Sequence, residues 1–168
     1  MISCKNLEQV DIFQGLNPNE IEDITKLCQE ANYEKDAIIF REGQKADFLY
    51  VVAKGKVDLR FRFPSFKRRF FFMKQDSSLE ITMYTVPEEK TFGWSALIEP
   101  HQYTQSAYCV ETCGLIRIDG KKLLELCERS SNLGFHVMRN LAQLISERLK
   151  LHRDQIKREF QEYFLPKW

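Results

Sequence analysis

The sequence predicts a mainly β fold with flanking helices, in which a jelly-roll β-barrel is followed by a long C-terminal helix. Two observations lead to this prediction. Several short apolar stretches between residues 37 and 118 are separated by glycine-containing turns, which is typical of barrels built from short strands. After residue 119 the apolar residues change to a spacing of three, four or seven, which indicates helices. The length of 168 residues suits one such unit with an appended helix.

A short helix is expected ahead of the barrel. Asn17 can cap it, Pro18 suits its first position, and Glu20 can reach back to the capping residue. Ile21 and Ile24 then follow at helical spacing.

The predicted strands are short. Residues 57–63 alternate apolar and charged side chains, as expected of a strand with one buried face, and residues 79–84 alternate in a similar way. Gly43 and Gly55 fit turns that require a positive φ. The full set of predicted strands is 37–40, 48–53, 57–63, 79–84, 104–110 and 115–118.

Two helices are predicted after the barrel. Asp119 is expected to cap the first, and Ser130 or Ser131 to cap the second, which runs to about Phe164. The apolar face of the second helix extends further than one barrel can cover, so we expect it to pair with a second copy in a homodimer. The predicted division of the chain is therefore 1–130 for the barrel with its N-terminal helices and 131–168 for a dimerisation helix.

Composition excludes several classes of protein. The net charge of +1 gives no overall attraction to nucleic acids or membranes. The five cysteines include no CxxC pair, so we expect reduced thiols in a cytoplasmic protein without a bound metal or cofactor. The N-terminus lacks the features of a signal peptide, and no apolar segment approaches the length of a transmembrane helix.

No catalytic constellation is evident, and we expect a protein that is not an enzyme. The sequence shows no Ser–His–acid or Cys–His pattern, and its strands lack the histidines and carboxylate of a cupin-type metal site. His136 and His152 fall on the long helix, where a surface or packing role is expected. His101 is the histidine that merits a test as a ligand-binding residue.

Three segments together resemble a known family. Residues 42–57, with Gly43, Asp47 and Gly55, and the later segments 92–98 and 103–107 are similar to the signature of cyclic-nucleotide-binding domains of the catabolite-activator superfamily. This resemblance covers residues from about 7 to 150. It implies a jelly roll, a phosphate-binding cassette, and a C-terminal helix beside the pocket. The DNA-reading helices found in the regulators do not follow within these 168 residues, so direct sequence-specific DNA binding is not expected.

The cassette departs from the family pattern at two positions. In the family a glutamate holds the ribose and an arginine binds the phosphate, and this sequence has Trp94 and Gln105 there. Losing the charged partner of a buried anion costs about 2–5 kcal/mol, so tight binding of cyclic AMP in the usual pose is not expected. Trp94 either stacks on a base or plugs the pocket. The candidate ligand-binding residues are Gly93, Trp94, Ser95, Ala96, Gln105, Ser106 and Ala107.

The segment between the two alternating strands is rich in aromatic and basic residues. Residues 60–74 contain six phenylalanines and six basic residues without an acid. Such a segment either packs over the barrel or forms a docking surface for an acidic partner or a membrane. The candidate partner-contact residues are Arg68, Arg69, Phe70, Phe71 and Phe72.

Two functions of different classes follow from these observations. The first is a regulatory small-molecule sensor that binds a cyclic nucleotide or another small anion and signals by repacking of the C-terminal helix. The second is a protein-interaction or dimerisation module without a ligand, in which the barrel is a scaffold and residues 60–74 contact the partner.

Overall fold

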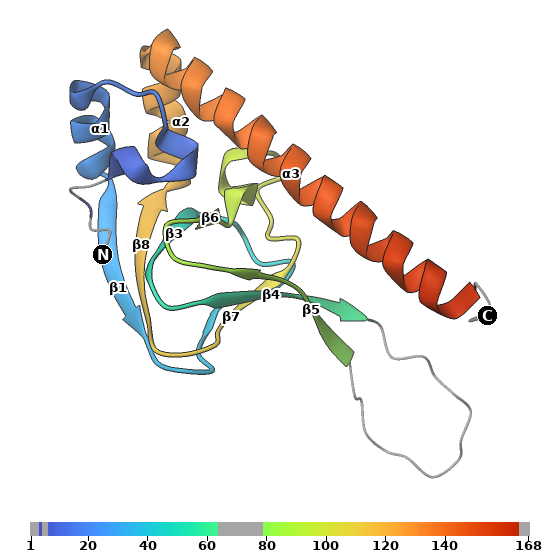
Figure 1. The fold of residues 1–168 in the computed structure, drawn as a ribbon. Helices are drawn as coiled ribbons and strands as arrows, with labels where there is room; N and C mark the ends of the chain where they lie inside the picture. The colour runs from blue at the N-terminus through green and yellow to red at the C-terminus, as the bar shows by residue number, and fades with distance from the viewer. Residues whose placement is uncertain (1–3, 5–6, 64–78, 165–168) are drawn as a thin grey trace.

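A computed structural model describes residue 4 and residues 7–63 and 79–164 of the chain. Two four-stranded antiparallel sheets form a barrel, short helices gather at one end, and one long helix runs along its side (Figure 1). The predicted jelly-roll fold with a long C-terminal helix is confirmed.

Each sheet combines strands that lie far apart in the sequence. The first sheet has the order β1–β8–β3–β6, with bounds Cys28–Tyr33, Cys113–Asp119, Phe48–Lys54 and Thr91–Phe92. The second has the order β2–β7–β4–β5, with bounds Ile38–Phe40, Ser106–Cys109, Val57–Phe63 and Leu79–Val86. The six predicted strands are all present; 57–63 has the predicted ends, and the ends of the other five are shifted. The predicted strand at 104–110 is shorter than expected, because Thr104 and Gln105 line a pocket instead of pairing.

Two strands were not predicted. The strand β1 carries mostly polar residues and exposes several of them, so it lacks the apolar alternation that identifies a half-buried strand. It forms because it adds to the edge of β8, with Cys28 opposite Ile118 and Tyr33 opposite Cys113. The strand β6 has only two residues, which is too short for a sequence pattern to detect.

Short helices close one end of the barrel. The 3-10 helices η1 (Leu7–Gln9) and η2 (Asp11–Phe13) precede α1 (Pro18–Thr25). The predicted start of α1 is confirmed, because the Asn17 side chain accepts a hydrogen bond from the Glu20 N–H at 3.0 Å and the Glu20 carboxylate accepts one from the Asn17 N–H at 3.0 Å.

Two helices follow the barrel, as predicted. Helix α2 (Gly120–Arg129) begins after Asp119, whose side chain accepts a hydrogen bond from the Lys122 N–H at 3.0 Å. Helix α3 spans Ser131–Phe164 and passes from the short helices along the barrel (Figure 1). The division of the chain into 1–130 and 131–168 stays a prediction.

The core has two parts. The first lies under the short helices and includes Phe13, Ile24, Leu123 and Leu133. The second fills the barrel and is rich in aromatic rings, among them Phe40, Tyr50, Phe92 and Tyr103. The cassette segment lies at the boundary, since Leu97 belongs to the first part and Ala96 to the second.

The first half of α3 is fixed by buried polar contacts. The Asn140 side chain is 4% exposed and donates hydrogen bonds to the carbonyls of Ile12 at 3.1 Å and Gln14 at 2.8 Å. The Glu20 carboxylate accepts hydrogen bonds from the Asn132 side chain at 3.0 Å and from the Ser130 hydroxyl at 3.1 Å. These bonds join α3 to the N-terminal helices across more than 100 residues of sequence.

Candidate functional site

A sharp turn after β6 positions the cassette. Gly93 has a φ of +74°, a left-handed conformation that favours glycine, and the 3-10 helix η3 (Trp94–Leu97) follows it. A Cβ atom at Gly93 would lie 3.2 Å from the Tyr50 ring and 3.3 Å from the Phe48 carbonyl oxygen. The glycine is therefore required by both its conformation and its surroundings.

A small pocket opens beside this turn. Its volume is about 30 Å³, which is the space of one water molecule. The aromatic rings of Phe40 and Tyr103 stack beside it with centroids 3.6 Å apart. The Tyr103 hydroxyl donates a hydrogen bond to the Phe48 carbonyl at 2.8 Å, which fixes this ring against β3. The pocket is lined by Phe40, Leu59, Gly93, Trp94, Ser95, Tyr103, Thr104 and Gln105.

The structure brings four of the seven candidate ligand-binding residues to this pocket, namely Gly93, Trp94, Ser95 and Gln105. The other three have different surroundings. Ala96 lies on the side of η3 that packs against Gly120, Ala107 is fully buried in the barrel core, and the buried Ser106 hydroxyl accepts a hydrogen bond from the Glu42 N–H at 3.0 Å. Ser106 and Ala107 therefore support the site from within the barrel.

Helix α2 packs closely against the back of η3. A Cβ atom at Gly120 would lie 2.7 Å from both the Cβ atom and the carbonyl oxygen of Ala96. The Gly120 N–H also donates a hydrogen bond to the Asp47 carbonyl at 2.9 Å. The absence of a side chain at Gly120 is what permits this contact.

Arg148 is a further residue at this site that the sequence did not indicate. Its guanidinium carbon lies 3.2 Å from the ring centroid of Tyr84 on β5 and 5.4 Å from that of Trp94 on η3. Burial lowers the pKa of Arg148 from its ordinary value, because a charged guanidinium loses hydration there. The alternating charges around residues 147–162 are typical of a solvated face, and only the fold reveals the contact of Arg148 with the cassette.

Arg60, which follows the pocket-lining Leu59 on β4, is another basic residue close to this site. Its guanidinium lies 3.2 Å from an oxygen of Asp58 and stacks 4.4 Å from the ring centroid of Tyr108. The charge of Arg60 therefore already has a carboxylate partner, while its buried Nε atom has no hydrogen-bond partner among the described residues.

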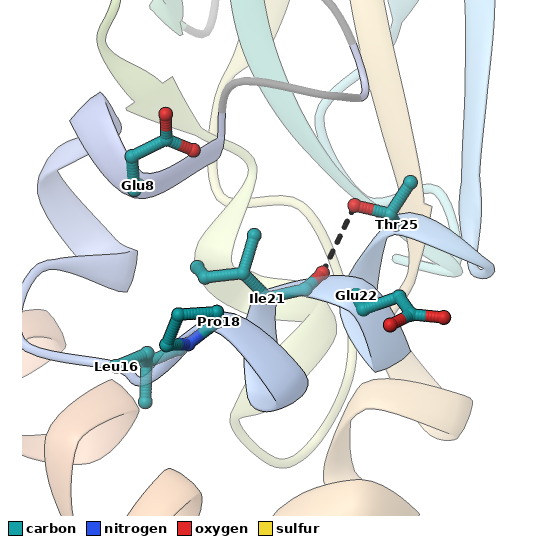
Figure 2. Close-up of a pocket in the computed structure, with 6 residues that line it drawn as sticks. All are labelled: Glu8, Leu16, Pro18, Ile21, Glu22 and Thr25. Carbon is teal, nitrogen blue, oxygen red and sulfur yellow. Dashed lines mark hydrogen bonds between the residues drawn. The ribbon is translucent and has the colours of Figure 1, made fainter.

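Two larger cavities lie elsewhere. One, of about 520 Å³, is lined by His101 and the back of η3 at Ala96, so His101 faces a different space from the cassette pocket. The other, of about 550 Å³, lies between η1 and α1 and shares no residue with the cassette pocket (Figure 2). The lining of this second cavity is Glu8, Leu16, Pro18, Ile21, Glu22 and Thr25.

Within the described ranges, no group of three or more His, Cys, Asp or Glu side chains is arranged to hold a metal ion. No helix in the described part of the chain is long and apolar enough to cross a membrane. The predicted partner-contact residues Arg68, Arg69, Phe70, Phe71 and Phe72 lie outside the described residues.

Fold and site define a class of protein: a jelly-roll domain whose glycine turn and short 3-10 helix line a pocket beneath a long C-terminal helix. Residues 30–130 match the family described as the cyclic nucleotide-binding domain. The chain belongs to this family, as the resemblance of its sequence motifs implied.

Two relatives are bacterial regulators. The chain is 24% identical to the CRP-like cAMP-activated global transcriptional regulator of Mycobacterium tuberculosis, over 82% of this chain and 56% of the relative. It is 28% identical to the cyclic AMP receptor protein of Thermus thermophilus, over 83% of this chain and 57% of the relative. The chain therefore spans little more than half the length of these relatives.

Two solved structures of similar fold are matched over most of their own length. A putative cyclic nucleotide-binding protein from Geobacter metallireducens is 29% identical, with a TM-score of 0.70 over 89% of this chain and 99% of that protein. A cyclic nucleotide-binding domain from Methylobacillus flagellatus has a TM-score of 0.75 over 93% of this chain and 85% of its own. At 18% identity, the latter shows the fold alone.

Proposed function

We propose that this chain is a regulatory small-molecule sensor domain without enzymatic activity. Its ligand is a cyclic nucleotide or another small anion that binds at an altered phosphate-binding cassette. The observation that carries the proposal is the position of Trp94, which lines the cassette pocket and also lies 5.4 Å from the guanidinium of Arg148 on α3. Two relatives whose names describe cyclic AMP regulators add support.

The narrow pocket explains how binding is coupled to the helix. Ligand pockets commonly have about 300–1,000 Å³, whereas this one has about 30 Å³. A nucleotide enters only when an aromatic ring moves, and the Trp94 ring contacts α3. Binding therefore repacks α3, and the coupling free energy equals the ligand's difference in affinity for the two helix positions.

Titration calorimetry with cyclic AMP, cyclic GMP and cyclic dinucleotides tests this function. We expect weak binding of cyclic AMP by the natural chain, and an affinity about thirtyfold or more higher in the Gln105→Arg variant, because the variant restores a charged partner for the phosphate. Gln102→Arg is a matched control that makes the same substitution at an exposed residue that does not line the cassette pocket. Millimolar or absent binding of every nucleotide to the natural chain and to Gln105→Arg would exclude nucleotide sensing.

We also propose that α3 pairs with a second copy. Phe135, Leu149 and Ile156 expose 62%, 68% and 64% of their surface, and they are spaced fourteen and seven residues apart. Such spacing places them along one stripe of the helix, as in paired helices. Pairing would cover this stripe, and it would let a change in α3 reach the partner.

A ligand-free interaction module is the second candidate function. The observation that favours it is the same pocket, because a volume of about 30 Å³ is also what a permanently filled site would show. In this case Arg68, Arg69 and Phe70–Phe72 contact the partner. Pull-down with Phe70, Phe71 and Phe72 changed to serine tests it, and an unchanged set of captured proteins would count against it.

A further inference from the structure

We infer that Arg148 of α3 supplies the positive charge that the cassette lacks at Gln105, and that it binds the anionic group of the ligand. The inference rests on the proposed sensor function and names the residue that recognises the ligand's charge. Its evidence is the position of Arg148, the absence of a carboxylate partner, and the geometry of its ring contacts.

Both aromatic ring partners of Arg148 connect it to the pocket. Trp94, one of its two ring partners, lines the pocket directly. Tyr84, the other partner, stands opposite Leu59 in the pairing of β4 and β5, and Leu59 also lines the pocket. A ligand that displaced the Trp94 ring would therefore bring its anionic group next to the guanidinium.

The charge of Arg148 has no direct partner in the described part of the chain, where the ion pairs do not include it. The Asp11 carboxylate is near enough to favour the charged form of Arg148. That carboxylate already accepts a hydrogen bond from the Thr91 hydroxyl at 2.6 Å and lies 3.9 Å from the Lys90 ammonium. A partly buried cation without a paired anion is costly, and an incoming anion would relieve this cost.

The ring contacts do not use the hydrogen-bond donors of Arg148. Tyr84 lies against a face of the guanidinium at 3.2 Å, while the five N–H donors point outward in the guanidinium plane. Among the described residues no hydrogen bond from Arg148 competes for them. A phosphate can therefore be bound by two parallel hydrogen bonds while the ring contact with Tyr84 persists.

The ligand class follows from this geometry. The phosphate meets Arg148, and a flat base can occupy the space of the Trp94 ring, so a nucleotide phosphate fits better than a small inorganic anion. Because the binding charge belongs to α3 itself, the ligand would act on the helix directly.

Fluorescence titration tests the inference. In a Trp168→Phe background Trp94 is the sole tryptophan and reports on the pocket. The probes are cyclic AMP, cyclic GMP, cyclic di-GMP and inorganic phosphate at constant ionic strength. We expect Arg148→Met to weaken binding of the responding nucleotide about thirtyfold or more, the ratio typical of a lost charged partner. We expect Arg148→Lys, which keeps the charge, to weaken it less.

Arg153→Met is the matched control. It removes the same charge from the same helix, but the Arg153 side chain is 59% exposed and pairs with Asp154. Its affinity should stay within about twofold of the parent, because exposed ion pairs contribute little. If Arg148→Met fails to fold by circular dichroism, Arg148→Gln takes its place.

The outcomes separate the two proposals. A nucleotide that binds the parent and Arg148→Met equally well would overturn the role of Arg148 and leave the sensor function intact. Inorganic phosphate binding as tightly as every nucleotide would overturn the nucleotide assignment. No binding of any probe by the parent would overturn the sensor function and this inference together.

Discussion

The two halves of α3 have opposite surroundings. In the first half Leu133, Val137 and Leu141 are almost completely buried against the short helices. In the second half Leu149 and Ile156 expose 68% and 64% of their surface, while Arg148 contacts the barrel through aromatic rings. One continuous helix thus combines a segment fixed by a core with a segment held by contacts that a ligand or a second copy can replace.

The largest expected effect comes from making the same substitution in each half. We expect Leu133→Ala to lower the free energy of unfolding by about 2–5 kcal/mol, because it leaves a cavity in a packed core. The control Leu149→Ala should change it by less than about 0.5 kcal/mol, as is usual for an exposed residue. Urea unfolding followed by circular dichroism, at a concentration where all variants are monomeric, measures both. Equal losses would show that the two halves do not differ.

A buried polar contact of the first half should have the next largest effect. Asn140→Ala leaves the carbonyls of Ile12 and Gln14 without their side-chain donor, so we expect a loss of about 1–3 kcal/mol. Gln143→Ala, an exposed position on the same helix, is the control and should be nearly neutral. If urea unfolding shows the two variants to be alike, Asn140 does not anchor the helix.

Substitutions in the exposed second half of α3 should change dimerisation and leave the free energy of unfolding nearly unchanged. If α3 pairs with its twin, the joint change Leu149→Ser and Ile156→Ser should weaken dimerisation at least tenfold, about 1.4 kcal/mol, through the loss of buried apolar area. Sedimentation equilibrium measures this. Ile98→Ser changes another exposed apolar residue, 42% exposed, outside the helix, and should leave association unchanged. A monomeric natural chain would contradict the pairing.

The smallest effect should be a difference in acid sensitivity. Burial alone would raise the pKa of the Glu20 carboxyl, but hydrogen bonds from Asn132, the Asn17 N–H and Ser130 outweigh it and lower the pKa below 4.5. A lowered folded-state pKa stabilises the fold above the unfolded pKa, and this stabilisation is lost as the pH falls through the folded pKa.

Glu20→Gln should therefore cost about 1 kcal/mol near neutral pH and reduce the loss of stability in acid. Thermal unfolding between pH 7 and pH 3, compared with the natural chain, measures this difference. Asp154→Asn removes an acid from the exposed half of α3 and should behave as the natural chain does. The same acid sensitivity in Glu20→Gln and the natural chain would show that Glu20 is not responsible for it.

Local patterns were sufficient for much of the fold. The cap at Asn17, the glycine turn at Gly55 and the start of the long helix each depend on a few neighbouring residues, and the structure has all of them. The strand β1 was missed because its polar residues form a strand only through the edge of β8, which comes 80 residues later. Propensity and periodicity do not carry such distant pairing.

The sequence predicted the glycine turn of the site but not the side-chain contacts around its pocket. The order of residues around Gly93 predicted the cassette turn, because a positive φ and a close approach need a glycine there. The stacking of Phe40 on Tyr103 joins residues 63 positions apart, and the contact of Arg148 with Trp94 depends on how a helix crosses a barrel. Both depend on tertiary packing, which a single sequence does not display.

The missing side chain at Gly120 has a mechanical consequence. A Cβ atom at Gly120 would lie only 2.7 Å from two atoms of Ala96. The backbone of α2 therefore begins in direct contact with η3, without a side chain of residue 120 between them. Because η3 and α2 are in direct contact, a displacement of the cassette would also displace the start of α2. A single residue, Ser130, separates α2 from α3, so α2 provides a second connection from the pocket to the outer helix besides the contact of Trp94 with Arg148.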